Sequence, residues 1–179
     1  MAAGPKAAST PTRSTWAVQT LAIQPSDRVL EIGCGRGAAI GLICPHLRDG
    51  TMTALDRSAA MVSLARSHNA EHVASGRARI ELAAFGPEPL ADQRFTKIFA
   101  INVSLFWAGT PTEELNLVRR LLLPGGRFYL FYEQHSPARA AAIAARLGPL
   151  LAECGFAART RTAASRHAAM IALIADPVG

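Results

Sequence analysis

The chain has 179 residues, of which 50% are apolar and 18% are charged, and its formal net charge is +6. This composition is typical of one globular domain and excludes a disordered chain. Its apolar stretches are interrupted by Arg, Gly or Pro well before the ~20 residues that a membrane helix needs, so no membrane association is expected. We predict a flexible tail at residues 1–12, a single domain at residues 13–179 and a cytoplasmic location, since no signal segment opens the sequence.

The positive charge comes almost entirely from arginine and is scattered along the chain. The densest group lies near the C-terminus and consists of Arg159, Arg161 and Arg166. A basic net charge favours anionic partners in general, so nucleic acid is kept as an alternative partner that the sequence does not favour. The three cysteines have neither the spacing of metal ligands nor that of a disulfide framework, and no metal is predicted.

The first half of the chain begins with a predicted helix at residues 14–23 and a strand at 29–32. A glycine-rich turn follows, and it opens a helix that Pro45 must kink or end, because proline removes a helix hydrogen bond. A strand at 52–56 comes next, and Ser58 is expected to cap the helix after it.

The second half continues the alternation of strands and helices that is typical of βα units on a parallel sheet. In chain order it holds strands at 78–83 and 97–101, a helix at 113–122, a strand at 127–132 and a helix at 137–153. Residues 156–164 and 167–175 are two strand-like runs with a short link, which predicts a hairpin.

The glycine-rich turn carries the clearest chemical signal. Gly33, Gly35 and Gly37 sit between a buried strand and a helix, where glycine permits a sharp turn and the first helix amides favour an anionic or nucleotide-like group. Asp56 ends the next strand, where a carboxylate can accept hydrogen bonds from a ribose diol. Glu31, two residues before the turn, must be paired or hydrogen-bonded. It either neutralises a cationic ligand or ties down the glycine turn.

A dinucleotide-dependent oxidoreductase is an alternative, because residues 33–38 satisfy the loose form G-x-G-x-x-G/A. The chain is too short for a separate substrate domain, has no Tyr-x-x-x-Lys pair and ends its sheet in a hairpin. These features disfavour that alternative.

Four segments occur in the order of a known set of motifs. They are VLEIGCGRG at residues 29–37, ALDRS at 54–58, LLPGGR at 122–127 and the pair Gly155-Phe156 before the hairpin. Together they resemble the class I S-adenosylmethionine-dependent methyltransferases over about residues 14–175. The resemblance implies an α/β fold, with a Rossmann-like, seven-stranded, mostly parallel sheet, helices on both faces and a C-terminal antiparallel hairpin. It also implies S-adenosylmethionine as the cofactor.

The resemblance implies residues for the methionine part of the cofactor. Gly33, Gly35 and Gly37 would approach it, Glu31 would organise the region, and Asn102 would contact it after the fourth strand.

For the adenosine part, the resemblance implies that Asp56 binds the ribose hydroxyls and that Arg57 and Met61 flank the adenine. Phe85 would contact the adenine edge. The acidic residue that the family usually has after the third strand is absent, since Ala83 and Ala84 precede Phe85. The adenine amino group would then be held by backbone or water.

Methyl transfer requires that the acceptor and the methyl group are held at contact distance and that water is excluded. A base is needed only when the acceptor must lose a proton. Candidates for the acceptor side follow the fourth and fifth strands and comprise Asn102, Trp107, Glu133 and His135. His135 is either a general base or an exposed loop residue, and Trp107 either stacks on a planar acceptor or packs on the next helix.

The sequence therefore predicts methyl transfer from S-adenosylmethionine to an unidentified acceptor, with a small molecule favoured. The alternatives are a methyltransferase that acts on RNA, DNA or a protein side chain, and a non-catalytic module that binds S-adenosylmethionine. The oligomeric state is not predicted.

Overall fold

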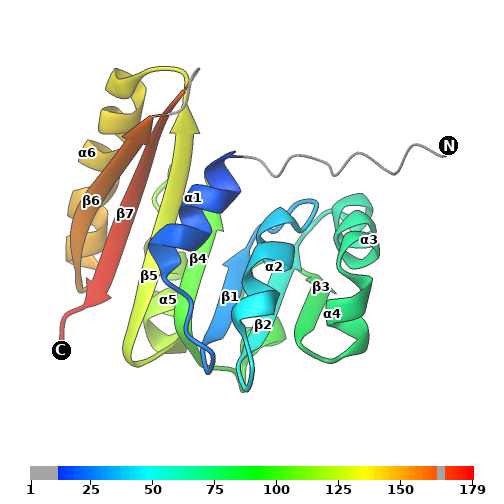
Figure 1. Cartoon of the computed structure of the whole chain (residues 1–179). Helices are drawn as coiled ribbons and strands as arrows, with labels where there is room; N and C mark the ends of the chain where they lie inside the picture. The colour runs from blue at the N-terminus through cyan, green and yellow to red at the C-terminus, as the bar shows by residue number, and fades with distance from the viewer. Residues whose placement is uncertain (1–11, 165–167) are drawn as a thin grey trace, which may run out of the picture.

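The computed structural model describes residues 12–164 and 168–179. The tail predicted at residues 1–12 therefore lies, except for residue 12, outside the described residues, as do Arg166 and the predicted start of the last strand at residue 167. Seven strands form one sheet in the order β3-β2-β1-β4-β5-β7-β6. Figure 1 shows this sheet with helices on both faces.

Five neighbouring strands of the sheet are parallel, namely β3 (Ala78–Leu82), β2 (Thr51–Asp56), β1 (Arg28–Ile32), β4 (Phe95–Ile101) and β5 (Leu122–Gln134). β7 (Ala169–Pro177) is antiparallel to β5 on one side and to β6 (Phe156–Ala164) on the other. The predicted α/β class, with a Rossmann-like sheet that closes in an antiparallel hairpin, is confirmed.

The helices fall into two layers, which two separate hydrophobic clusters define. On one face pack α1 (Thr12–Leu21), α2 (Ala38–Ile43) and α3 (Ala59–His68). On the other pack α5 (Thr112–Leu121) and α6 (Pro137–Glu153). A short α4 (Ala70–Ala74) and three 3-10 turns complete the described elements, η1 (Cys44–His46), η2 (Glu88–Leu90) and η3 (Ser104–Phe106).

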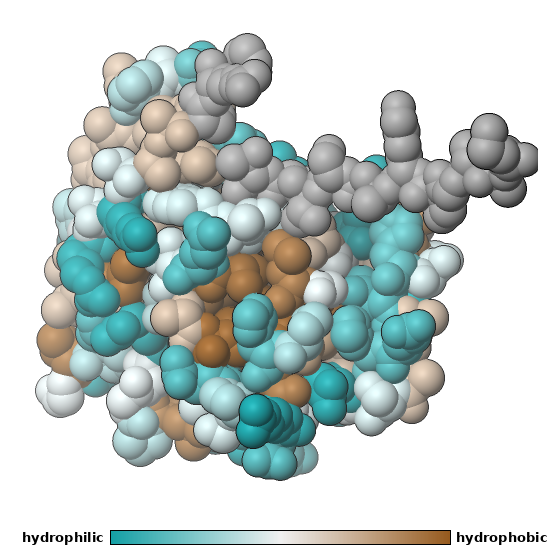
Figure 2. Space-filling view, in the orientation of Figure 1, coloured by the Kyte–Doolittle hydropathy of each residue, from teal (hydrophilic) through white to brown (hydrophobic). Residues whose placement is uncertain are grey.

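Side chains of the central strands alternate between the two layers. Val29 packs into the α1–α3 cluster, whereas Leu30 and Ile32 pack into the α5–α6 cluster. Strands that are buried on both faces are usually apolar throughout. Glu31 departs from this rule, because it points to the α1–α3 side with only 3% of its surface exposed. Figure 2 shows apolar side chains gathered over the middle of the face on which α1 and α2 lie.

The start of β5 differs from the prediction. The strand was expected at residue 127 after a turn, but it begins at Leu122, which pairs with Phe95. The next pair joins Lys97 to Arg127, so extra residues of β5 bulge out of the ladder. A Cβ on Gly126 would lie 2.9 Å from the Phe95 carbonyl oxygen, so the close approach of the two strands requires glycine there.

Within the described ranges, no helix is both long enough and apolar enough to cross a membrane.

Candidate cofactor site

The turn between β1 and α2 is held against the end of β2. The amides of Gly33 and Cys34 both donate to the carbonyl of Leu55, at 2.8 and 2.9 Å. Gly33, Gly35 and Gly37 have φ angles of +73°, +53° and +77°, a region that residues with a Cβ rarely adopt. The prediction that this turn needs glycine is confirmed.

The three glycines differ in what surrounds them. A Cβ on Gly33 would lie 2.7 Å from a methyl group of Val103, and one on Gly37 would lie 2.6 Å from the Asn69 amide nitrogen. A Cβ on Gly35 would meet no atom of the described residues within 4 Å. Gly33 and Gly37 therefore permit close packing, whereas Gly35 leaves space that a ligand can fill.

Asp56 braces the glycine turn from the end of β2. One carboxylate oxygen accepts from the Gly35 amide at 2.8 Å and the other from the Ser58 amide at 2.9 Å. Ser58 caps α3 as predicted, because its hydroxyl accepts from the amide of Met61 at 3.4 Å. Asp56 thus fixes both the turn and the start of the next helix.

A cavity of about 780 Å³ opens beside the glycine turn at the carboxyl edge of the sheet. Residues of α1, α2 and α3 all contribute to its wall. The volume lies in the range of small-molecule sites. Predicted cofactor residues that line the cavity are Glu31, Gly33, Gly35, Gly37 and Met61.

Glu31 is a buried carboxyl group in the wall of this cavity. Its Oε2 atom is buried and has no hydrogen-bond partner in the part of the chain that the structure describes. Burial raises the pKa of Glu31 well above its ordinary value, and the neighbouring negative charge of Asp56 raises this pKa further. Oε2 therefore does not tie down the glycine turn among the described residues, which leaves the alternative that Glu31 neutralises a cationic ligand. A cationic ligand would supply the missing partner.

The other predicted cofactor residues, Asp56 among them, are not part of the wall of this cavity. Phe85 packs on Phe106, with ring centroids 6.4 Å apart, against the α5–α6 cluster. Asn102 has a φ of +56° and accepts a hydrogen bond from the Glu133 amide at 2.8 Å, which ties the ends of β4 and β5 together. Arg57 is exposed. The cofactor contacts of these side chains stay predictions.

The acceptor candidates are not gathered into one cluster. Trp107 is 40% exposed after η3, and His135 is exposed after β5. Glu133 forms an ion pair with Arg13 of α1 at 3.3 Å, which connects the end of β5 to a residue that lines the cavity. Their roles toward an acceptor stay predictions.

Several residues of the cavity wall lie outside the predicted motifs. Arg13 comes from α1, and His68 and Asn69 come from the end of α3. The Asn69 amide donates to the Gly37 carbonyl at 3.1 Å, and His68 Nδ1 lies 3.2 Å from the Arg36 carbonyl oxygen. No motif marks these positions, since they reach the glycine turn only through the packing of helices on the sheet.

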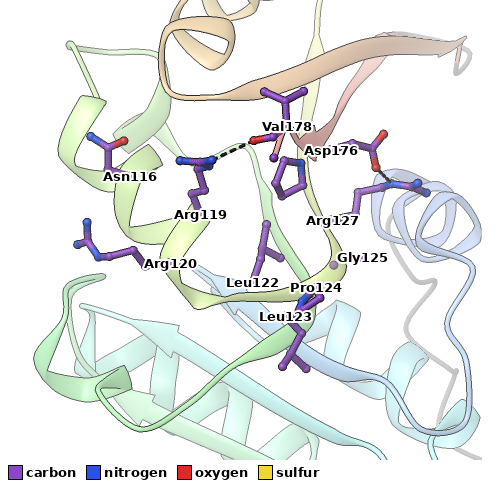
Figure 3. Close-up of a pocket in the computed structure, with 13 residues that line it drawn as sticks. Asn116, Arg119, Arg120, Leu122, Leu123, Pro124, Gly125, Arg127, Asp176 and Val178 are labelled. Atoms are coloured by element: carbon purple, nitrogen blue, oxygen red, sulfur yellow. Dashed lines mark hydrogen bonds and ion pairs between the residues drawn. The ribbon is translucent and has the colours of Figure 1, made fainter.

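A second cavity, of about 730 Å³, lies at the opposite edge of the sheet, where β5 begins and β7 ends (Figure 3). Arg119 donates to the Val178 carbonyl at 2.9 Å, while Arg127 and Arg159 both pair with Asp176. These groups satisfy one another and hold the strand ends in place. The cavity lies where the parallel strand β5 begins and shares no lining residue with the glycine turn, whereas ligands of open α/β sheets bind beyond the carboxyl ends of the strands.

The sheet, the glycine turn and the acid at the end of β2 define a Rossmann-like domain for a nucleotide-type cofactor. A family model described as "Methyltransferase domain" matches residues 29–126, which is more than half of the chain. The protein belongs to this methyltransferase family.

Individual relatives agree with the family. The uncharacterized methyltransferase YdaC of Bacillus subtilis is 27% identical over 121 residues, which cover 68% of this chain and 64% of that protein. Trans-aconitate 2-methyltransferase of Delftia acidovorans is 33% identical over 102 residues, 55% of this chain and 35% of that protein. A SAM dependent methyltransferase from Aquifex aeolicus shares the fold, with a TM-score of 0.70, 16% identity and coverage of 90% of this chain and 88% of that chain. The matches span only 35% to 64% of the curated relatives' own lengths.

Proposed function

We propose that this protein transfers a methyl group from S-adenosylmethionine to a small-molecule acceptor. The observation that carries the proposal is the buried carboxyl group of Glu31, whose Oε2 has no partner among the described residues, in a cavity that also holds the open side of Gly35. The ammonium and sulfonium groups of S-adenosylmethionine are cationic, so they fit this carboxylate. When bound, the cofactor supplies a methyl group on a sulfonium, which is already a good leaving group.

The chain's own residues bind and orient in this proposal. Gly33, Gly35 and Gly37 bring backbone close to the ligand, and Met61 packs beside it. Asp56 accepts one hydrogen bond on each oxygen, and a carboxylate has further acceptor sites for the ribose hydroxyls. α1 and α2 exclude water from this side of the cavity, which strengthens the electrostatic contacts inside it.

A small-molecule acceptor is supported by the similarity to trans-aconitate 2-methyltransferase. A nucleic-acid acceptor is less favoured, because Arg159 pairs with Asp176 on the strands at the far edge of the sheet. A cytoplasmic location belongs to the same proposal. Cys34, Cys44 and Cys154 are free and buried, which fits a reducing compartment.

Calorimetry with the demethylated product, S-adenosylhomocysteine, tests the proposal. We expect the wild-type protein to bind it and Asp56→Ala to weaken binding by about tenfold to a hundredfold, the effect of losing hydrogen bonds to a charged group. Arg159→Ala, at the far edge of the sheet, serves as the control and should bind like the wild type. Absence of wild-type binding at high micromolar concentration contradicts the proposal. If folded Asp56→Ala and the wild type bind S-adenosylhomocysteine with equal affinity, Asp56 does not bind the ribose hydroxyls. Turnover with candidate acceptors separates an enzyme from a non-catalytic module.

The pH dependence of binding is expected to report on Glu31. Because the pKa of Glu31 is raised, the carboxyl group is protonated at lower pH and loses its attraction for the ligand's ammonium group. Affinity for S-adenosylhomocysteine should therefore rise as pH increases through this raised pKa, and Glu31→Gln should remove that rise. The comparison is made below the pH at which the ligand's own ammonium group titrates.

The same linkage affects the stability of the ligand-free protein. Above the ordinary pKa of 4.5, the unfolded chain releases the Glu31 proton that the folded chain keeps. The free energy of unfolding should then fall as pH rises between the ordinary and the raised pKa. Urea unfolding of wild type and Glu31→Gln should show this slope only in the wild type. If the free energy of unfolding changes with pH equally in the wild type and in Glu31→Gln, the raised pKa of Glu31 is contradicted.

A further inference from the structure

The first turn of α1 brings a cation to the cavity. Arg13 and Ser14 both line its wall, together with Glu31 and Ile101. In Figure 1, α1 lies beside α2 and in front of β4 and β5, with its first turn toward the carboxyl edge of the sheet. A residue outside the predicted motifs thus reaches the same space as the glycine turn.

Arg13 is held only loosely in the structure. Its Nη1 atom pairs with Glu133 Oε2 at 3.3 Å, and the two side chains are 44% and 25% exposed. Ion pairs with this exposure contribute little to stability, since water and salt screen them. A guanidinium has five N–H donors, and Glu133 is the partner of Arg13 among the described residues. Arg13 is therefore free to turn toward a stronger anionic partner.

The cavity presents two opposite charges at different depths. Glu31 is 3% exposed, whereas Arg13 stands at the mouth. This arrangement complements a zwitterion with an ammonium group directed inward and a carboxylate directed toward α1.

We propose that Arg13 binds the carboxylate of the cofactor's amino-acid part, while Glu31 faces its ammonium group. This inference rests on the proposed function, because it assumes that the cavity binds S-adenosylmethionine. Without ligand, Glu133 pairs with Arg13 near the mouth of the cavity. The Glu133 amide donates to the Asn102 side chain, and this hydrogen bond fixes Glu133 at the end of β5. On binding, the guanidinium exchanges Glu133 for the ligand carboxylate, a geometry that arginine matches with two parallel hydrogen bonds.

Two ligands that differ in the amino-acid part test the proposal by calorimetry. S-adenosylhomocysteine carries the ammonium and carboxylate groups, and 5′-methylthioadenosine lacks both. Arg13→Ala should weaken S-adenosylhomocysteine binding by about tenfold or more, as expected for losing a charge-assisted contact. Binding of 5′-methylthioadenosine should change by less than about twofold, and Arg13→Lys should retain part of the affinity for S-adenosylhomocysteine.

Arg159→Ala is the matched control, because Arg159 also forms an exposed ion pair but lies on β6 at the far edge of the sheet. It should not change the ratio of the two affinities. If Arg13→Ala weakens both ligands equally, or neither, the role of Arg13 is overturned. If the wild-type protein binds neither ligand, the proposed function itself fails. Thermal unfolding followed by circular dichroism confirms that each variant is folded.

Discussion

Replacing Gly37 by Val is expected to lower the free energy of unfolding by about 3–5 kcal/mol. Gly37 has a φ of +77°, so any Cβ there is strained. That Cβ would also lie 2.6 Å from the Asn69 side chain and 3.1 Å from the Cα atom of Ala65, which is backbone of α3. The helix would have to move, and the hydrogen bond from Asn69 to the Gly37 carbonyl would be lost. Urea unfolding followed by circular dichroism measures the change.

Gly35→Val is the matched control, because it makes the same substitution two residues earlier in the turn. Its φ of +53° also strains a Cβ, but none of the described atoms lies within 4 Å. The stability loss should be limited to about 1–2 kcal/mol of backbone strain. Binding of S-adenosylhomocysteine should nevertheless be lost, because the new side chain would occupy the cavity. Equal destabilisation by the two variants would contradict this account of the turn.

Asp27→Ala is expected to destabilise the protein by a similar amount, about 3–5 kcal/mol, the cost of leaving a buried charge without its partner. Asp27 is 5% exposed just before β1. Its carboxylate accepts from the Gln24 amide at 2.7 Å, the Thr96 hydroxyl at 2.8 Å and the Lys97 ammonium at 2.5 Å. These bonds join the turn after α1 to β4. The substitution would leave Lys97, whose side chain is 13% exposed, without this partner.

Chemical unfolding of single and double variants separates the charge from the packing. Asp27→Ala combined with Lys97→Met removes both charges and should recover part of the loss. Arg159→Ala breaks an exposed ion pair and should cost less than about 1 kcal/mol. If Asp27→Ala lowers the free energy of unfolding by less than about 1 kcal/mol, the ion pair between Asp27 and Lys97 is solvated.

The sequence predicted those elements best whose ends carry local signals. The last helix spans residues 137–153, as predicted from its alanine-rich sequence between Pro137 and Gly155, and the structure shows that Ser136 caps it. Its Ser136 hydroxyl accepts from the Arg139 amide at 3.3 Å. The first helix begins at Thr12 and ends at Leu21, two residues before the predicted range at both ends. The glycine turn was predictable because it combines a backbone requirement with a buried strand.

Features that depend on contacts between distant segments could not be predicted. Leu122 belongs to β5 only because Phe95 pairs with it across the sheet. Arg13 reaches the cavity only because α1 packs against α2, and its partner Glu133 lies 120 residues away in the sequence. Whether Glu31 finds a partner depends equally on the packed structure. A motif can specify the turn, but not the side chains that the fold brings to its open side.

The position of β7 between β5 and β6 has a consequence for how the protein forms during synthesis. Ile171, Leu173 and Ala175 belong to one hydrophobic cluster, and Met170, Ala172 and Ile174 belong to the other. Both clusters therefore stay incomplete until residues 169–177 have left the ribosome. Earlier segments can form helices and parallel pairs, but non-local strand pairing is slow and exposes apolar surface meanwhile. Cooperative folding of this domain therefore requires β7, and nascent chains that still lack it expose apolar surface that favours aggregation.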